Sequence, residues 1–112
     1  MKRAFVESKN FQQFVDSLGD PNLVADIQSL ILEDPESGAV VQGTGGIRKM
    51  RVADRSRGKG TRGGFRVLFL DLPDKEKSYL LVIYQKGRKE DISNDEKKAL
   101  KELVQKIKKE AR

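Results

Sequence analysis

The chain has 112 residues, of which 37% are hydrophobic and 36% charged, so we expect one soluble domain spanning residues 1–112. It contains no cysteine and no histidine, which argues against a disulfide framework and a zinc or iron centre, and we expect no cofactor. No apolar run reaches the roughly 18 residues of a membrane span, and the first residues lack the apolar stretch of a signal peptide, so we expect a cytoplasmic protein without membrane contact.

The net charge of +6 comes from one segment of the chain. Residues 1–47 carry three bases and seven acids, residues 48–66 carry eight bases and one acid, and residues 67–112 carry twelve bases and nine acids. Positive charge confined to one segment indicates a polyanionic partner and favours nucleic acid.

The N-terminal part predicts a short strand followed by two helices. Residues 3–7 read as the strand, and the apolar residues of 8–18 recur at helical spacing. Asp20 followed by Pro21 is typical of an N-cap with proline at the first helical position, so a second helix is expected from there to Asp34–Pro35. The tight turn between the helices predicts an antiparallel pair.

From residue 39 the pattern changes to short β-rich segments. Four of them cover residues 39–42, 46–53, 64–72 and 77–86, and the last two are joined by a hairpin-like turn carrying Pro73. Ser93 and Glu96 form a capping box that opens a final helix, whose apolar stripe is Leu100, Leu103, Val104 and Ile107. The order of elements predicts an α+β fold, in which the helix pair covers one face of a mainly antiparallel sheet and leaves the other face partly open.

Side-chain alternation assigns the basic strand residues to a face of that sheet. Met50 and Val52 suit the helix-covered face, which leaves their neighbours Lys49 and Arg51 on the open face. The expected cluster on the open face consists of Lys49, Arg51, Arg66 and Lys86, with Arg88 just beyond the strand end. Solvated charges at the rim are the alternative reading, but lysine and arginine are less usual inside strands than on helix surfaces.

Such a cluster binds phosphate whether or not it does chemistry. Arginine offers a planar fork of donors and lysine a compact charge, and crowding by like charges makes a lysine a candidate general base. RNA brings its own nucleophile, the 2′-hydroxyl, so a protein need only orient it, accept its proton and stabilise the charged phosphorane. On composition alone, plain binding ranks above catalysis.

Two further features are weaker. The run from Gly43 to Gly46 has no lysine followed by serine or threonine and leads into a strand, so it predicts a bend between strands rather than a P-loop. Tyr84 shares a face with Lys86 and is either a core or rim aromatic or a platform on which an RNA base stacks.

The ordered motifs GTGGIRKMRVA, RGGFRVLFL and YLLVIYQKGRKEDIS, with a helix pair before them and a helix after, resemble the RelE superfamily of bacterial toxins, in particular its HigB-type branch. The resemblance covers nearly the whole chain. It implies a ribosome-dependent endonuclease that cleaves messenger RNA in the ribosomal A site, and a cognate antitoxin, DNA-binding and HigA-like, that holds the toxin inactive. Whether that antitoxin covers the basic face or binds elsewhere, such as on the N-terminal helices, stays open.

The resemblance also implies roles for the basic residues. By position, Lys49 and Arg51 match the basic pair of the family's central strand. Arg66 matches the arginine of the family's Gly-aromatic-Arg motif, and either Lys86 or Arg88 matches the basic residue that follows the last core strand. Some members stack a base on a C-terminal tyrosine, but residues 93–112 contain none, so that role is empty or falls to Tyr84.

We therefore predict that Arg66 and Arg51 hold the scissile phosphate and that Lys49 or Lys86 takes the 2′-hydroxyl proton. Contacts with the RNA backbone are expected from Arg48, Arg55, Arg57, Lys59 and Arg62. Two alternatives remain: a gyrase-inhibiting toxin of the ParE type on the same fold, and a non-catalytic module that binds RNA or ribosomes.

Overall fold

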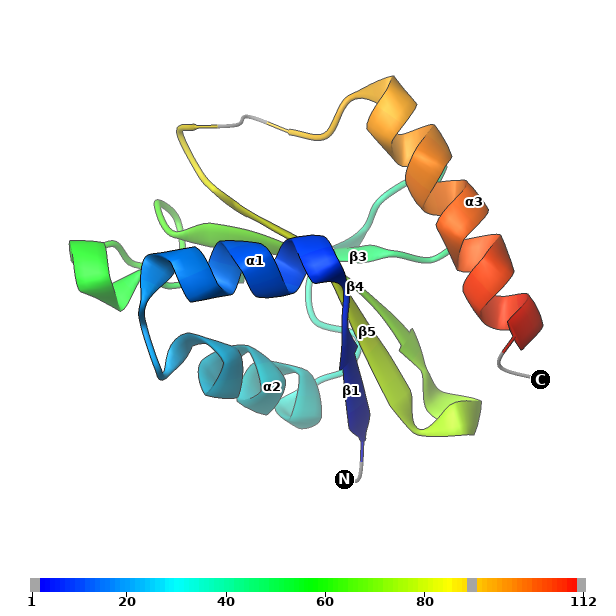
Figure 1. Ribbon diagram of the computed structural model, residues 1–112, viewed down its shortest axis with the longest axis horizontal. Coiled ribbons are helices and arrows are strands. Elements are labelled where there is room, and N and C mark those ends of the chain that lie inside the picture. The colour runs from blue at the N-terminus through cyan, green and yellow to red at the C-terminus, as the bar shows by residue number, and fades with distance from the viewer. Residues whose placement is uncertain (1–2, 89–90, 111–112) are drawn as a thin grey trace.

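The computed structural model describes residues 3–88 and 91–110. The elements are β1 Ala4–Glu7, α1 Lys9–Leu18, α2 Leu23–Glu33, β2 Ala39–Val40, β3 Arg48–Val52, β4 Phe65–Leu72, β5 Lys77–Gln85 and α3 Asn94–Glu110, with the 3-10 turns η1 Arg55–Arg57 and η2 Pro73–Lys75 (Figure 1). This order of strands and helices confirms the predicted α+β fold. None of the helices within the described ranges is long and apolar enough to cross a bilayer.

The helix ends follow local side-chain chemistry. Ser8 caps α1, because its Oγ accepts a hydrogen bond from the Phe11 N–H at 3.1 Å. The capping box predicted for α3 is confirmed, since the Ser93 N–H donates to Glu96 Oε1 at 2.9 Å and the Glu96 N–H donates to Ser93 Oγ at 3.1 Å. Both helices therefore begin where the sequence indicates.

The start of α2 was predicted incorrectly. Asp20 does not cap the helix directly, because its Oδ1 accepts the N–H of Asn22 at 3.0 Å and closes a turn around Pro21. The helix begins after that turn, at Leu23, and it ends at Asp34 as expected. The local turn competes with the helix for the same backbone groups.

The five strands form one sheet in the order β1-β5-β4-β3-β2. β1 runs parallel to β5, and the other neighbouring pairs are antiparallel. A β-bulge interrupts the β4–β5 ladder between Leu68 and Phe69, so that Leu68 lies opposite Val82 and Phe69 opposite Leu80. The sheet thus brings the basic strand β3 beside β4 at its centre, with β5 next to it.

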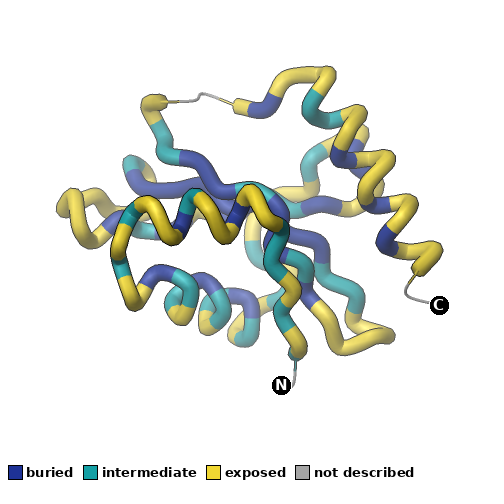
Figure 2. Tube along the Cα trace, viewed as in Figure 1, coloured by how far each residue is buried: buried dark blue, intermediate teal, exposed yellow. Residues whose placement is uncertain are grey.

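Each face of the sheet has its own hydrophobic core. On one face, Met50 and Val52 of β3 pack with α1 and α2, as alternation predicts. On the other face, Leu68 and Leu70 of β4 pack with Leu100, Val104 and Ile107 of α3. Figures 1 and 2 show these buried strands between helices whose outer surfaces are exposed.

The face opposite the helix pair is therefore covered at one end by α3 and open at the other. The predicted apolar stripe of α3 needs one correction, because Leu103 is 37% exposed and points away from the sheet. The open end of this face is where the functional residues gather.

Candidate functional site

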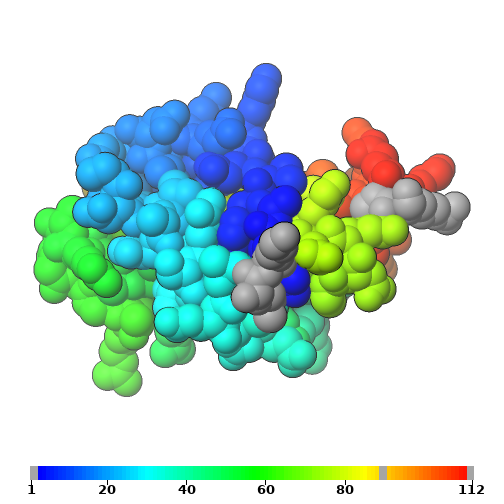
Figure 3. Space-filling model, turned by 90° about the horizontal axis from the view of Figure 1, so that it is seen from below, coloured from blue at the N-terminus to red at the C-terminus, as the bar shows by residue number. Residues whose placement is uncertain are grey.

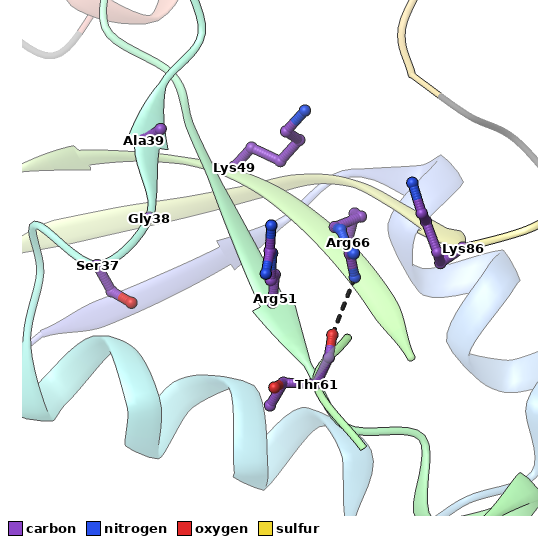
Figure 4. Close-up of a pocket in the computed structure, with 8 residues that line it drawn as sticks. All are labelled: Ser37, Gly38, Ala39, Lys49, Arg51, Thr61, Arg66 and Lys86. Atoms are coloured by element: carbon purple, nitrogen blue, oxygen red, sulfur yellow. Dashed lines mark hydrogen bonds between the residues drawn. The ribbon is translucent and has the colours of Figure 1, made fainter. Parts of the chain in front are cut away.

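A pocket of about 510 Å³ opens on the part of the sheet that α3 does not cover. Its lining residues come from β2 and the segment before it, from β3, β4 and the loop between them, and from the chain just after β5 (Figure 4). They are Ser37, Gly38, Ala39, Lys49, Arg51, Thr61, Arg66 and Lys86. Four of these eight residues are cations, so the pocket is built to receive an anion.

The strand register explains why these cations meet. Arg51 of β3 lies directly opposite Arg66 of β4, and cross-strand partners share a face. Lys49 lies two residues before Arg51 and hence on the same face, while Lys86 follows the end of β5. The structure thus brings together Lys49, Arg51, Arg66 and Lys86. Arg88 is exposed and does not line the pocket.

Arg66 is the buried member of the cluster, with 6% of its surface exposed. Its Nη1 donates to the carbonyl oxygen of Thr61 at 3.1 Å (Figure 4) and to that of Phe65 at 3.2 Å, and its Nη2 donates to the carbonyl of Arg62 at 2.9 Å. These main-chain acceptors fix the guanidinium in the floor of the pocket. Its Nε and the second hydrogen on Nη2 have no partner among the described residues, so donors remain for an anion.

Arg51 differs from Arg66 in being exposed. Among residues 3–88 and 91–110, its side chain makes no hydrogen bond or ion pair. In Figure 4 its side chain lies beside that of Arg66, with Lys49 further along β3. The Arg51 guanidinium can therefore bind a phosphate without breaking a contact within the protein.

Lys49 is paired with a residue that the sequence reading did not single out. Its Nζ lies 3.2 Å from Oδ1 of Asp91, which also accepts the N–H of Ile92 at 2.8 Å. The Ile92 hydrogen bond, together with Lys49, lowers the pKa of Asp91, although partial burial works against it. Asp91 is therefore a carboxylate at neutral pH. Its place in a charged stretch after β5 carries no sequence signal that would connect it with Lys49.

The predicted backbone-binding cations divide into two groups. Arg48 faces away from the pocket: its Nη1 donates to the carbonyls of Glu36 at 2.9 Å and Gly38 at 3.0 Å, which ties the segment before β2 to β3. The other four, Arg55, Arg57, Lys59 and Arg62, lie on the exposed loop between β3 and β4. Figure 3 shows this loop, in green, projecting beyond α2 at the end of the molecule opposite the β4–β5 turn.

The loop is held in shape by one buried acid. Asp54 is 1% exposed and accepts hydrogen bonds from Ser56 Oγ at 2.8 Å and from both the N–H and the guanidinium of Arg57. Burial by itself would raise the pKa of Asp54, but the hydrogen bonds from Arg57 and Ser56 lower it overall. Arg57 also lies over the Phe65 ring, 5.9 Å from its centroid. Its guanidinium is thus engaged within the protein, whereas the side chains of Lys59 and Arg62 make no hydrogen bond or ion pair among the described residues.

The alternative in which Tyr84 stacks on an RNA base requires correction. Tyr84 lies opposite Arg66 in the sheet, but it is 6% exposed and packs in the core beneath α3. Its hydroxyl is buried without a hydrogen-bond partner among the described residues. Burial, together with the charge of Asp91, raises the pKa of this hydroxyl. The ring is therefore part of the core beneath α3 and does not present a face to solvent.

The sheet, the three helices and the basic pocket define an α+β protein with an anion-binding site on its open face. Residues 5–112 match the family model described as the RelE toxin of the RelE / RelB toxin–antitoxin system. The chain belongs to this family and is the toxin of a toxin–antitoxin pair, so a cognate antitoxin is its partner.

Proposed function

We propose that this toxin is a ribosome-dependent endoribonuclease, which inhibits translation by cutting messenger RNA in the A site of the cytoplasmic ribosome. The observation that carries the proposal is the pocket in which Lys49, Arg51, Arg66 and Lys86 converge on one face of the sheet. Four cations around a space of this kind suit a phosphodiester, whose charge increases as the phosphorane forms. Membership of the RelE family supports the same reading.

In the proposed reaction, the 2′-hydroxyl of one nucleotide attacks the phosphorus that follows it. The new bond joins the 2′-oxygen to phosphorus, the bond from phosphorus to the 5′-oxygen breaks, and a 2′,3′-cyclic phosphate remains on the upstream fragment. Arg66 and Arg51 hold the phosphate, because their guanidinium donors match its oxygens. The leaving 5′-oxygen receives a proton from solvent water as it departs, which balances the proton that a lysine removes from the 2′-hydroxyl.

Lys49 and Lys86 remain the two candidates for accepting the 2′-hydroxyl proton. Lys49 forms an ion pair with Asp91, and Lys86 lies on the other side of Arg66, so the two lysines flank the arginine that holds the phosphate. Cleavage rates measured over a range of pH, for variants that lack one lysine or the other, separate the two. The general base is the lysine whose loss removes the rise of the rate with pH.

The loop cations are proposed to bind the ribosomal RNA backbone. Arg55, Lys59 and Arg62 are exposed on a loop that projects from the molecule, and the same loop carries Thr61, which lines the pocket. Backbone contacts of this kind add affinity without selecting sequence. The proposed antitoxin is HigA-like and DNA-binding, by the resemblance to the HigB-type branch.

The direct test is to map transcript 5′ ends after adding the protein to messenger RNA, with and without translating ribosomes. We expect cuts within codons only when ribosomes translate, and far fewer with Arg51→Ala. Lys101→Ala removes one exposed charge from α3, outside the pocket, and serves as the matched control. Uncut transcripts in the presence of both protein and translating ribosomes would refute the proposal. If the protein instead blocks DNA supercoiling by gyrase in a separate assay, the ParE-type activity would replace it.

A further inference from the structure

The pocket has two unlike sides. The cationic side is formed by Lys49, Arg51, Arg66 and Lys86, and the opposite side, which we call the neutral wall, is formed by Ser37, Gly38 and Ala39. Figure 4 shows the neutral wall on the other side of Arg51 from Arg66 and Lys86. Thr61 adds a hydroxyl near the base of the pocket. One pocket therefore offers charge to one part of a ligand and uncharged polar groups to another.

The size of the pocket requires more than a phosphate to fill it. Its volume of about 510 Å³ lies within the roughly 300–1,000 Å³ of sites that enclose whole small molecules. A phosphate bound by the cations occupies only their side. The space between the cations and the neutral wall is left for the nucleoside attached to that phosphate.

The neutral wall is rigid because its backbone is packed against β3. Gly38 has φ +79°, and a Cβ built on it would lie 2.2 Å from the carbonyl oxygen of Lys49. Arg48 holds the same segment from behind, through hydrogen bonds to the carbonyls of Glu36 and Gly38. Ala39 pairs with Lys49 across the ladder. The wall therefore keeps a fixed distance from the cation beside it.

Ser37 supplies the chemistry of this wall. Its N–H is satisfied by the carbonyl of Asp34 at 3.0 Å, but its hydroxyl makes no hydrogen bond within the described chain. The side chain is half-buried, and Figure 4 shows its oxygen directed toward the Arg51 side. A serine hydroxyl both donates and accepts, so it can pair with either kind of group on a base edge.

We infer that the Ser37 hydroxyl, held on the fixed segment 37–39, forms a subsite that recognises the base of the nucleotide whose phosphate the cations hold. This inference rests on the proposed function and deepens it, because it makes Ser37 a residue that determines base preference. Unpaired RNA bases are commonly read by hydrogen bonds to their edges, which is the contact that this wall offers. The cations then supply affinity for any nucleotide, and the wall discriminates among them.

The first test compares cleavage maps of Ser37→Ala, Ser37→Thr and the unaltered protein. We expect cutting beside the preferred base to fall about threefold to tenfold in Ser37→Ala, the effect of losing one hydrogen bond, while cutting beside the other bases changes less, so that the relative use of the four bases shifts. Ser37→Thr retains the hydroxyl and keeps the original preference. Ser17→Ala removes a hydroxyl that bonds only to its own helix, at Phe14, and should leave the map unchanged.

The second test needs no ribosome. Affinities of inorganic phosphate and of the four nucleoside 3′-monophosphates are measured for the unaltered protein and for Ser37→Ala. We expect the unaltered protein to bind at least one nucleotide more tightly than phosphate, and Ser37→Ala to lose that base selectivity while keeping its affinity for phosphate. Identical affinities for all four nucleotides before and after the substitution would overturn the inference, even if ribosomal cleavage is confirmed. Selectivity that depends on Ser37 would support the subsite even if the protein fails to cut messenger RNA.

Discussion

The cations of the pocket and those of the loop between β3 and β4 are neighbours in the sequence, but the fold gives them opposite surroundings. Lys49, Arg51 and Arg66 stand on adjacent strands and are aimed at one space. Arg55, Lys59 and Arg62 lie on an exposed loop, and none of them lines that pocket. Charge alone does not distinguish the two groups. Strand pairing does, because it places side chains from distant positions within reach of one ligand.

Removing Arg66 tests the pocket side of this comparison most severely. We expect Arg66→Ala to lower the rate of messenger RNA cleavage about 10²–10³-fold, the cost of losing one preorganised donor to a developing charge. Arg66→Lys should recover part of the rate, since it keeps the charge but not the planar fork. The measurement is single-turnover cleavage on ribosomes programmed with one codon in the A site. A rate equal to that of the unaltered protein would remove Arg66 from the mechanism.

Removing Arg51 should separate function from stability. Because its side chain has no partner in the described chain, Arg51→Ala should leave the melting temperature unchanged. Loss of one hydrogen-bonded contact with a charged phosphate should lower cleavage about 10–100-fold. Arg66→Ala, in contrast, should also lower the melting temperature, because Arg66 ties the Thr61 and Arg62 carbonyls to the sheet. Thermal unfolding of both variants gives the comparison, and a destabilised Arg51→Ala would contradict it.

The loop side of the comparison is tested by salt. A triple substitution, Arg55→Ala with Lys59→Ala and Arg62→Ala, should weaken binding to ribosomes about tenfold and reduce the slope of log affinity against log salt by up to about three. Base preference at the cut should stay the same, because backbone contacts carry no sequence information. Ribosome binding measured over a range of salt concentrations gives the slope. A slope equal to that of the unaltered protein would show that these three residues do not contact phosphate.

The smallest expected effect concerns the acid that shapes the loop. The folded-state pKa of Asp54 lies below its ordinary value of 3.8, so this carboxylate stabilises the fold above about pH 4, and the stabilisation is lost as the pH falls through the folded pKa. Asp54→Asn should lower the free energy of unfolding at neutral pH by about 1 kcal/mol. It should also flatten the acid side of the stability curve. Denaturant unfolding between pH 2 and pH 7 measures both, and an unchanged acid limb would show that other carboxylates control it.

Most of the secondary structure and the cationic half of the pocket could be predicted from the sequence, because each depends on local periodicity. Alternation along residues 48–52 was enough to place Met50 with the helices and Arg51 on the other face. The missed start of α2 has a local cause as well, since Asp20 closes a turn that resembles a cap in the sequence. These errors displace an element by a few residues but do not change the fold.

The remaining features depend on packing between distant segments, which periodicity does not report. The burial of Tyr84 follows from the way α3 and Ile92 lie over β5. The pairing of Asp91 with Lys49 joins residues 42 positions apart. Ser37 reaches the pocket only because Gly38 permits the chain to run against the β3 backbone. Sequence reasoning therefore identified the cations and missed the uncharged wall that faces them.

The parallel pairing of β1 with β5 has a consequence for how the toxin is made. The Ala4 backbone lies opposite Lys77, and Arg3 bonds to Asp71, 68 positions further along the chain. As the polypeptide leaves the ribosome, β1 can pair with β5 only after most of the remaining residues have emerged. Such long-range closure is slow relative to local contacts. The newly made chain thus acquires its finished edge late in synthesis, when the strands that carry the pocket have already been made.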